Sequence, residues 1–528
     1  MIDFAKPSLE YSELWPLLVI FAVACVGVII EAFAPRAVRY LAQVSLALIG
    51  SVVALVGVIM IGIDHDNGDS LDGAVVAMGA IVVDGPAIFV WGLLLVIAIA
   101  GTLLFAERRL EGGVSAFAGQ AAAVPGSEAE QEAVAHRLDH TEVYPLLMFA
   151  VAGMMLFAAA ADLLAFFVAL EVLSLPLYLL TGLARRRRLL SQEAALKYFL
   201  LGAFSSGFVI YGIALVYGYS GTMSYAGIHE AIANNADNRP LLLVGLGLIS
   251  VGLLFKIGAA PFQAWTPDVY QGAPTQVTAF MGAATKVAAF AAMMRLFYVA
   301  FGSERWTWVP VLAVIAVLTM VVGALLAIAQ SDVKRMLAYS SITHTGFLLT
   351  GLIGARASGD LADGQITSTQ AVLFYLVTYS FMTLGAFAVV SLVRDSGGET
   401  TQMARWAGLG KESPLVAGVF ALFLLGFAGI PLTAGFAGKW AVFASAMSAG
   451  QWQVVVAAVL TSALAAFFYI RVIVVMFFSE PEGEGPSVAL PSLATSVTIG
   501  FGVLATVILG VLPGPMLDLA AHAGEFIR

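Results

Sequence analysis

Long apolar runs follow one another along almost the whole chain, and short polar segments separate them. A helix needs roughly 20 apolar residues to cross a bilayer core about 30 Å thick. Most runs are apolar on every side, so they lack the two-residue alternation of a membrane β-barrel. The pattern predicts an all-α, polytopic membrane protein with about 14 transmembrane helices. The expected spans are 14–34, 38–63, 79–106, 142–160, 162–183, 193–219, 240–262, 274–301, 306–329, 333–354, 369–393, 413–446, 451–478 and 490–516.

Composition agrees with this class and excludes others. Of the 528 residues, 60% are hydrophobic and 11% are charged, whereas a soluble domain carries about 25% charged residues. A soluble globular protein and a disordered chain are therefore both excluded. The single cysteine, Cys25, excludes a disulfide framework and iron–sulfur clusters held by cysteines. The formal net charge of −9 argues against nucleic acid as a partner.

Basic residues predict the orientation in the membrane. Loops on the cytoplasmic side carry an excess of Lys and Arg, and here the basic residues gather in alternate loops, most densely at Arg185–Arg188. The loop that holds Asp64, Asp66 and Asp72 falls on the opposite side. We therefore expect both termini to face the outside.

Two expected spans are interrupted by Gly and Pro. The seventh contains the run Phe255–Pro261, and the twelfth contains the run Gly429–Lys439. Broken helices at corresponding places in two halves are typical of transporters built from inverted repeats. We therefore predict inverted five-helix repeats with broken seventh and twelfth helices. The expected segments are a three-helix unit at 1–106, a cytoplasmic linker at 107–141, a first repeat at 142–301, a second repeat at 306–478 and a C-terminal helix at 490–528.

Several ionisable residues lie inside the expected spans, where a charge costs about 3 kcal/mol on insertion scales. The deepest are Glu171, Lys256, Lys286 and Lys439. Three lysines at similar depth in three spans are hard to explain by snorkelling, because a snorkelling lysine lies near a helix end. They predict proton-accepting groups whose charge depends on a movable partner. Permanent ion pairs that fix the packing of the helices are the alternative.

Other charged residues leave more than one interpretation open. Lys197 lies within two turns of the inner end of its span, where it either snorkels or joins the buried charges. Arg295 and Arg471 lie nearer to span ends and are interpreted as interface residues or as partners in pairs between helices. His136 and His140 have a spacing that suits a metal, but a third ligand is not evident, so we predict no metal site.

The run Trp265–Thr275 resembles the signature after the seventh span in subunit N of bacterial NADH-quinone oxidoreductase, respiratory complex I. The runs Glu171–Pro176 and Asp332–Ile342, followed by His344, resemble it too, as does the break that ends at Lys439. The resemblance covers about 144–469. Related subunits L and M and the multi-subunit antiporters resemble one another around a Trp-Leu-Pro-Asp version of the signature. Subunit M has Glu where this chain has Lys439, and subunit L is longer.

The resemblance implies a proton-translocating subunit in the membrane arm of the complex. It implies that Glu171 and Lys256 form a modulating pair, that Lys286 is the central relay, and that Lys439 leads to the opposite side. Lys197 and His344 resemble auxiliary members of the same axis, and Asp268 resembles a residue that tunes proton entry.

The resemblance also implies where the other components lie. NADH, FMN, iron–sulfur clusters and quinone would be bound by other subunits, with no cofactor on this chain. The partners would be the antiporter-like subunit M, small subunits such as K and J, and the lipid of a bacterial plasma (inner) membrane. A subunit of a cation/proton antiporter is the alternative function, and a structural spacer in a larger membrane complex is a third interpretation.

Overall fold

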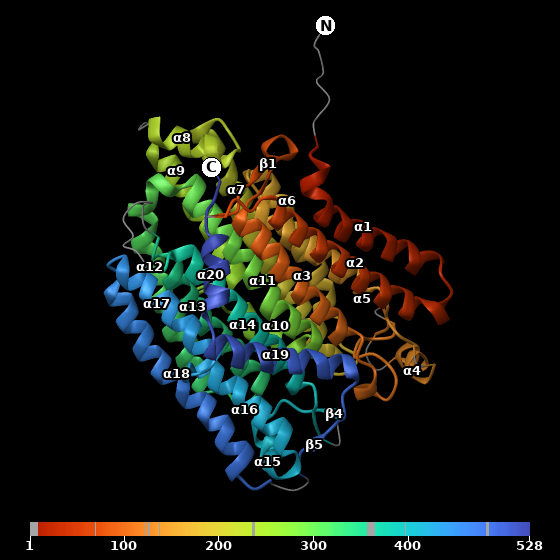
Figure 1. Ribbon diagram of the computed structural model, residues 1–528. Helices are drawn as coiled ribbons and strands as arrows, with labels where there is room; N and C mark the ends of the chain where they lie inside the picture. The colour runs from red at the N-terminus through yellow and green to blue at the C-terminus, as the bar shows by residue number, and fades with distance from the viewer. Residues whose placement is uncertain are drawn as a thin grey trace.

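The computed structural model describes residues 9–68, 70–120, 122–124, 127–136, 138–234, 238–355, 365–395, 398–481 and 485–527. Within these residues the fold is a bundle of α-helices with two very small sheets (Figure 1). Three long helices come first: α1 (Tyr11–Phe33), α2 (Arg36–Asp64) and α3 (Gly85–Phe105). The next group consists of α4 (Glu128–Ala135), α5 (Val143–Ala159), α6 (Leu163–Thr181), α7 (Arg188–Ser220), α8 (Tyr225–Asn234), α9 (Arg239–Ile257), α10 (Trp265–Gly272) and α11 (Thr275–Arg295).

The second half of the chain repeats this pattern of long and short helices. It consists of α12 (Arg305–Ile328), α13 (Val333–Leu352), α14 (Ser368–Val390), α15 (Leu409–Glu412), α16 (Pro414–Ala428), α17 (Ala434–Ser448), α18 (Trp452–Phe478), α19 (Leu493–Val511) and α20 (Gly514–His522). The strands β1 (Ala74–Val76) and β2 (Ile81–Val83) form one antiparallel hairpin. The strands β3 (Val393–Asp395), β4 (Gly398–Glu399) and β5 (Ser487–Val488) form the other sheet, with β3 in the middle.

The structure confirms an all-α membrane fold. Among the described residues, 11 helices are long and apolar enough to cross a membrane, and α5 and α16 are shorter apolar helices. Each range expected from the sequence contains a helix. The exact number of crossings and the inverted relation of the two repeats stay predictions.

The third expected span begins later than the apolar pattern suggested. Its helix starts at Gly85 rather than at residue 79, because Asp84 caps the helix by accepting a hydrogen bond from the Ala87 amide at 3.1 Å. Pro86 in the first turn favours the same start. The apolar residues just before Asp84 belong to β2, whose backbone bonds go to β1.

Both expected helix breaks are present. At the first break, α9 is followed by Gly258, which has a φ of 70°. At the second break, α16 is followed by Gly429, which has a φ of 82°. A left-handed glycine commonly ends a helix, because a residue without Cβ adopts this conformation without strain. At Gly429 an added Cβ would also lie 3.0 Å from the Cδ of Lys439. The helices α10 and α17 resume the chain beyond the two breaks.

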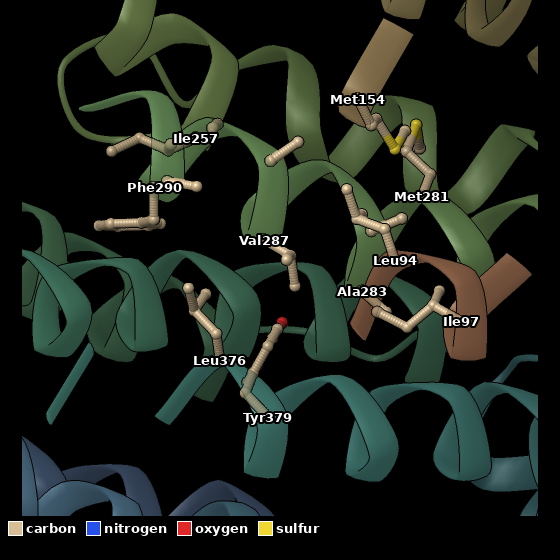
Figure 2. Packing of buried hydrophobic residues seen from close by; sticks show 14 of the residues in the cluster. Leu94, Ile97, Met154, Ile257, Met281, Ala283, Val287, Phe290, Leu376 and Tyr379 are labelled. Atoms are coloured by element: carbon tan, nitrogen blue, oxygen red, sulfur yellow. The ribbon is translucent and has the colours of Figure 1, made fainter. Parts of the chain in front are cut away.

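The two breaks are placed around a fully enclosed centre. Every residue of α11 is buried, and so is almost every residue of α14. Figure 2 shows apolar side chains of α3 (Leu94 and Ile97), α5 (Met154) and α14 (Leu376) around α11. A charged residue on α11 is consequently surrounded by protein rather than by lipid.

The segment 107–141, expected to be a flexible linker or a short surface helix, contains the short helix α4 and packs against the bundle where it is described. Phe117 is fully buried, and the Ala118 amide bonds the Leu183 carbonyl at 2.8 Å. Glu107 accepts bonds from the Ser492 amide at 2.8 Å and from the Thr495 hydroxyl at 2.6 Å. The segment therefore connects the loop after α6 with the start of α19.

The start of α1 and the segment that follows α20 lie at the same end of the bundle as α8, and α15 and β5 lie at the opposite end (Figure 1). Near the C-terminus, His522 bonds Asp66 at 3.0 Å, in the loop that follows α2. Termini at one end are what an even number of crossings requires.

A buried ion pair holds the outer ends of two central helices together. Arg295, at the end of α11, donates to both carboxylate oxygens of Asp84, at 2.6 and 2.8 Å, and its Nε donates to the Ala158 carbonyl at 3.1 Å. The Ile527 amide donates to the same carboxylate at 3.2 Å. This contact is a pair between helices, one of the two roles expected for Arg295. Arg471 likewise bonds the Ile328 carbonyl at the end of α12, at 2.9 Å.

We expect Arg295→Met and Asp84→Asn to lower the free energy of unfolding by about 3–5 kcal/mol each, because each leaves one buried charge without its partner. Asn at position 84 keeps an oxygen for the Ala87 amide, so the helix cap is preserved. Thermal unfolding of the purified protein in detergent measures the loss. The double variant removes both charges and should lose clearly less than the sum, and additive losses would contradict the prediction.

Candidate functional site

Lys286, in the middle of α11, contacts the broken end of α9. Its ammonium donates to the Ile257 carbonyl at 3.3 Å, to the Ser341 carbonyl at 3.1 Å and to the Thr345 hydroxyl. The last carbonyls of a helix have no partner within the helix and carry partial negative charge. The break in α9 therefore supplies acceptors for a buried cation. Thr345 also donates to the Ile257 carbonyl at 3.0 Å, which ties α13 to the same helix end.

Lys439 has the same relation to the other broken helix. It lies on α17 and donates to the Phe427 and Ala428 carbonyls at the end of α16, at 2.9 and 2.8 Å. Its third bond, at 2.8 Å, goes to the Ser462 hydroxyl of α18. Lys286 and Lys439 are each buried and each bonded to neutral oxygens, and neither forms an ion pair among the described residues. Two similar sites therefore lie at the two breaks.

Lys256 lies in the last turn of α9, beside the first of these sites. Its ammonium donates to the Ser174 hydroxyl at 2.7 Å and lies 5.8 Å from the centroid of the Tyr198 ring. Glu171 lies one turn before Ser174 on α6 and accepts a hydrogen bond from the Ser206 hydroxyl. Glu171 and Lys256 form no ion pair within 4.0 Å in the described part of the chain. The structure therefore has the pair in a separated arrangement, with Ser174 next to both.

His344 lies between the two lysine sites. It follows Ser341 and precedes Thr345 on α13, and its ring centroid lies 5.5 Å from that of Phe427, whose carbonyl binds Lys439. One ring nitrogen bonds the Tyr375 hydroxyl at 2.6 Å, and the other bonds the Tyr469 hydroxyl at 3.2 Å. Both nitrogens are thus in hydrogen bonds, so the imidazole can accept a proton at one and release it from the other.

Buried hydroxyl groups without partners lie on α13 and α14, the helices that carry Thr345 and Tyr379 beside Lys286. In the described residues, the side-chain oxygens of Ser341, Ser380 and Thr383 are buried and have no hydrogen-bond partner. The Tyr379 ring lies 5.8 Å from the ammonium of Lys286, and Figure 2 shows its hydroxyl directed towards α11. Buried polar groups are normally satisfied by protein or by ordered water. These hydroxyls are available to a mobile proton carrier beside the central lysine.

Two of the predicted residues form a separate cluster. Lys197 of α7 pairs with Asp268 of α10 at 2.8 Å and with Glu193 at 2.7 Å, and 43% of its side chain is exposed. Arg335, at the start of α13, donates to the other oxygen of Asp268 at 2.7 Å. Lys197 is therefore paired with carboxylates of α7 and α10 at a partly exposed position, and its auxiliary role stays a prediction.

The structure thus places Glu171, Lys256, Lys286, His344 and Lys439 in one row from α6 to α17, which we call the lysine row. Sequence reasoning missed hydroxyl groups that bond its members: Ser174, Thr345, Tyr375 and Tyr469. For Ser174 a signal existed, because a hydroxyl three residues after Glu171 lies on the same side of a helix. The two tyrosines reach His344 only through the packing of α14 and α18, which no local pattern reports.

Comparisons with known proteins identify the family. A family model described as "NADH:quinone oxidoreductase/Mrp antiporter, TM" matches residues 160–465. The NADH-quinone oxidoreductase subunit N of a Nocardioides species is 67% identical over 533 residues, covering 100% of both chains. The chain belongs to the NADH-quinone oxidoreductase subunit N family. Another subunit N, from Rhodococcus opacus, is 56% identical and covers 99% of this chain and 97% of its own length.

Solved structures agree with membership in the subunit N family. A chain of respiratory complex I from Thermus thermophilus is 33% identical, with a TM-score of 0.73 over 97% of this chain and 100% of that chain. A chain of the Mrp complex from Dietzia sp. has a TM-score of 0.79 over 98% and 97% of the two chains, at 21% identity. The second likeness shows the fold alone.

We expect Thr345→Val to slow proton transfer through the lysine row about tenfold, because a hydrogen bond to a charged group contributes roughly 1.5–3 kcal/mol. Valine has nearly the same shape, so packing is kept. Thr350→Val on the same helix is the matched control, since the Thr350 hydroxyl bonds the Gly346 carbonyl of its own helix. Proton uptake by inverted membrane vesicles measures the rate. Equal rates in the two variants would contradict the role of Thr345.

Proposed function

We propose that the chain translocates protons as a membrane-arm subunit of a bacterial NADH-quinone oxidoreductase. The observation that carries the proposal is the lysine row, in which two buried lysines bind the carbonyl ends of two broken helices and His344 lies between them. Buried ionisable residues in a membrane are costly and mark proton or ion pathways. The identity of 67% to a named subunit N supports the assembly to which the chain contributes.

The first step of the proposed mechanism is the separation of Glu171 from Lys256. While the two are close, the carboxylate stabilises the protonated lysine. In the separated arrangement Lys256 keeps only the Ser174 hydroxyl, a neutral acceptor. Its ammonium then releases a proton to Lys286, which accepts it as a neutral amine and becomes an ammonium; the carbonyl partner of Lys286, Ile257, is the next residue along the chain from Lys256.

The later steps carry the proton from Lys286 to Lys439. An ammonium at Lys286 gives up its proton and becomes a neutral amine, while His344 takes one proton at one nitrogen and releases another from the opposite nitrogen. The amine of Lys439 accepts that proton and becomes an ammonium held by the Phe427 and Ala428 carbonyls. Each transfer leaves the total charge of the lysine row unchanged and moves the positive charge from one member to the next.

The energies involved are compatible. Breaking a buried ion pair costs about 3–5 kcal/mol. Moving one charge against about 150 mV costs roughly 3.5 kcal/mol, at about 2.3 kcal/mol per 100 mV. Rearrangement of one pair therefore has the magnitude needed to move one proton.

The surroundings follow from the same proposal. The chain spans the bacterial plasma membrane with both termini outside, and the cluster of Lys197, Asp268 and Arg335 tunes proton entry from the inner side. Subunit M and small subunits such as K and J are its neighbours. Other subunits bind NADH, FMN, iron–sulfur clusters and quinone, so electron transfer reaches this chain as a change of charge or position.

A subunit of a cation/proton antiporter is the competing function, and the fold shared with the Mrp complex does not distinguish them. A sodium ion prefers several oxygen ligands, carboxylates among them. Glu171 is the one carboxylate among the deep residues of the lysine row. The distinction is made by the cation dependence of transport in the experiment that follows.

We expect Lys256→Met to reduce NADH-driven proton uptake by inverted vesicles to less than about a tenth, because a methionine cannot bind and release a proton. NADH oxidation that is coupled to pumping falls with it. A native gel confirms that the complex is assembled. Lys411→Met is the control, since Lys411 lies on the exposed surface, with 74% of its side chain accessible.

Pumping at the control rate in Lys256→Met would show that Lys256 is structural and would move the proposal towards the spacer. Proton movement that depends on sodium in the native chain, and continues without NADH, would instead favour the antiporter.

A further inference from the structure

A cavity of about 360 Å³ lies between the loop after α6, the start of α11 and the sheet that contains β4. It contains no member of the lysine row. Gln276, on its wall, precedes Lys286 by ten residues on α11, which corresponds to about 15 Å along a helix. Charged and polar side chains form most of its wall: Glu111, Arg185, Arg186, Arg187, Gln271, Thr275, Gln276, Lys334 and Glu399.

Positive charge exceeds negative charge on this wall, with four basic residues against two carboxylates. Glu111 is occupied by Arg186 and Arg394, at 2.9 and 2.6 Å, and Arg185 bonds Asp139 at 3.4 Å. The side chain of Glu399 accepts the Thr275 hydroxyl at 2.5 Å. The ion pairs therefore leave two basic residues and the Glu399 carboxylate of the wall without an ionic partner within 4.0 Å among the described residues.

Those two residues are Arg187 and Lys334, which bond neutral oxygens. Arg187 donates to the Glu399 backbone carbonyl at 3.1 Å and to the Thr401 hydroxyl at 3.3 Å. Lys334 is buried and donates to the Ala273 carbonyl at 2.7 Å and the Thr275 hydroxyl at 3.1 Å. Within the described residues, neither forms an ion pair within 4.0 Å. The carboxylate nearest to Lys334 on this wall, Glu399, is reached only through the Thr275 hydroxyl, so the buried ammonium has no direct anionic partner. A buried cation without direct neutralisation is unfavourable, so the wall is suited to a bound anion.

The start of α11 adds donors to the same wall. Pro274 precedes the helix and provides no side-chain cap, so the first amides of a 21-residue helix point outwards without one. Amides at a helix start bind anions, and the helix dipole favours negative charge there. Gln276, in this first turn, is 7% exposed, and its amide oxygen has no partner in the described structure. A half-turn of that amide would present its NH₂ group to an anion.

We propose that this cavity binds a phosphate group, held by Arg187, Lys334, Gln276 and the first amides of α11. A phosphate offers acceptor oxygens in several directions, which matches donors that come from three elements, whereas a carboxylate offers two oxygens in one plane. The group belongs either to an anionic phospholipid or to free phosphate. Basic pockets between membrane helices on the cytoplasmic side bind lipid headgroups. The excess positive charge also disfavours the cavity as a proton entrance.

Native mass spectrometry of the full-length chain in detergent tests the proposal. The probes are inorganic phosphate, phosphatidylglycerol, and phosphatidylcholine as a lipid without net charge. We expect Arg187→Gln to weaken binding at least tenfold, because it removes a charge-assisted bond from a solvent-exposed position without disturbing the core. Arg187→Lys keeps the charge and should restore part of the binding. Lys411→Gln, which removes a positive charge elsewhere, should bind like the native chain.

Each outcome of this measurement either supports or overturns the phosphate site. Binding of phosphatidylglycerol alone supports the site and identifies a lipid headgroup, and binding of phosphate alone supports it and identifies the free anion. Phosphatidylglycerol retained no better than phosphatidylcholine, with no phosphate bound, overturns the proposal. So does binding that is equal in the native chain, Arg187→Gln and Lys334→Gln. The measurement needs no pumping, so failure of the lysine row as a relay would leave its result unchanged.

Discussion

The arrangement of this protein depends on contacts between lysine ammonium groups and the carbonyl ends of broken helices. In an unbroken helix each of those carbonyls already bonds an amide of the next turn, so fewer acceptor positions are left for a buried cation. At Ile257, and at Phe427 with Ala428, the chain leaves the helical path, and Lys286 and Lys439 occupy the places of the missing donors. The carbonyls at each break accept hydrogen bonds from a lysine ammonium, and the ammonium supplies the donors that these carbonyls lack within their own helix. Within the described residues, Lys286 and Lys439 are therefore buried without a carboxylate partner within 4.0 Å.

The sequence predicted these features where one residue type imposes a local conformation or a clear cost. Gly258 and Gly429 end their helices, and a lysine among apolar residues is visible in any hydropathy pattern. The same reasoning placed the third helix too early, because the apolar side chains of β2 look like those of a span while Asp84 sets the true start. The helix cap formed by the Asp84 carboxylate therefore determines where the third helix begins, although the apolar run starts earlier.

Contacts between distant segments could not be predicted in this way. Arg295 was expected at an interface or in a pair, yet its partner Asp84 is 211 residues away. The bonds of His344 to Tyr375 and Tyr469 require three helices in one packing arrangement. For Lys197 the sequence left snorkelling and a place among the buried charges both open, and only the packed structure shows that its side chain bonds Asp268. Depth in the membrane can be read from a sequence, whereas the direction in which a side chain points requires the packed bundle.

The bonds of Lys286 also bear on how the chain is made. Its acceptors Ser341 and Thr345 lie 55 and 59 residues later in the chain, so at 5–20 residues per second they emerge roughly 3–12 s after it. Lys256 differs, because Ser174 is synthesised before it. Lys439 is intermediate: Phe427 and Ala428 precede it, and only Ser462 follows, 23 residues later. Until α13 has been synthesised, the central charge of α11 therefore has only part of its final set of acceptors. The order of synthesis makes the packing of α11 depend on the arrival of α13.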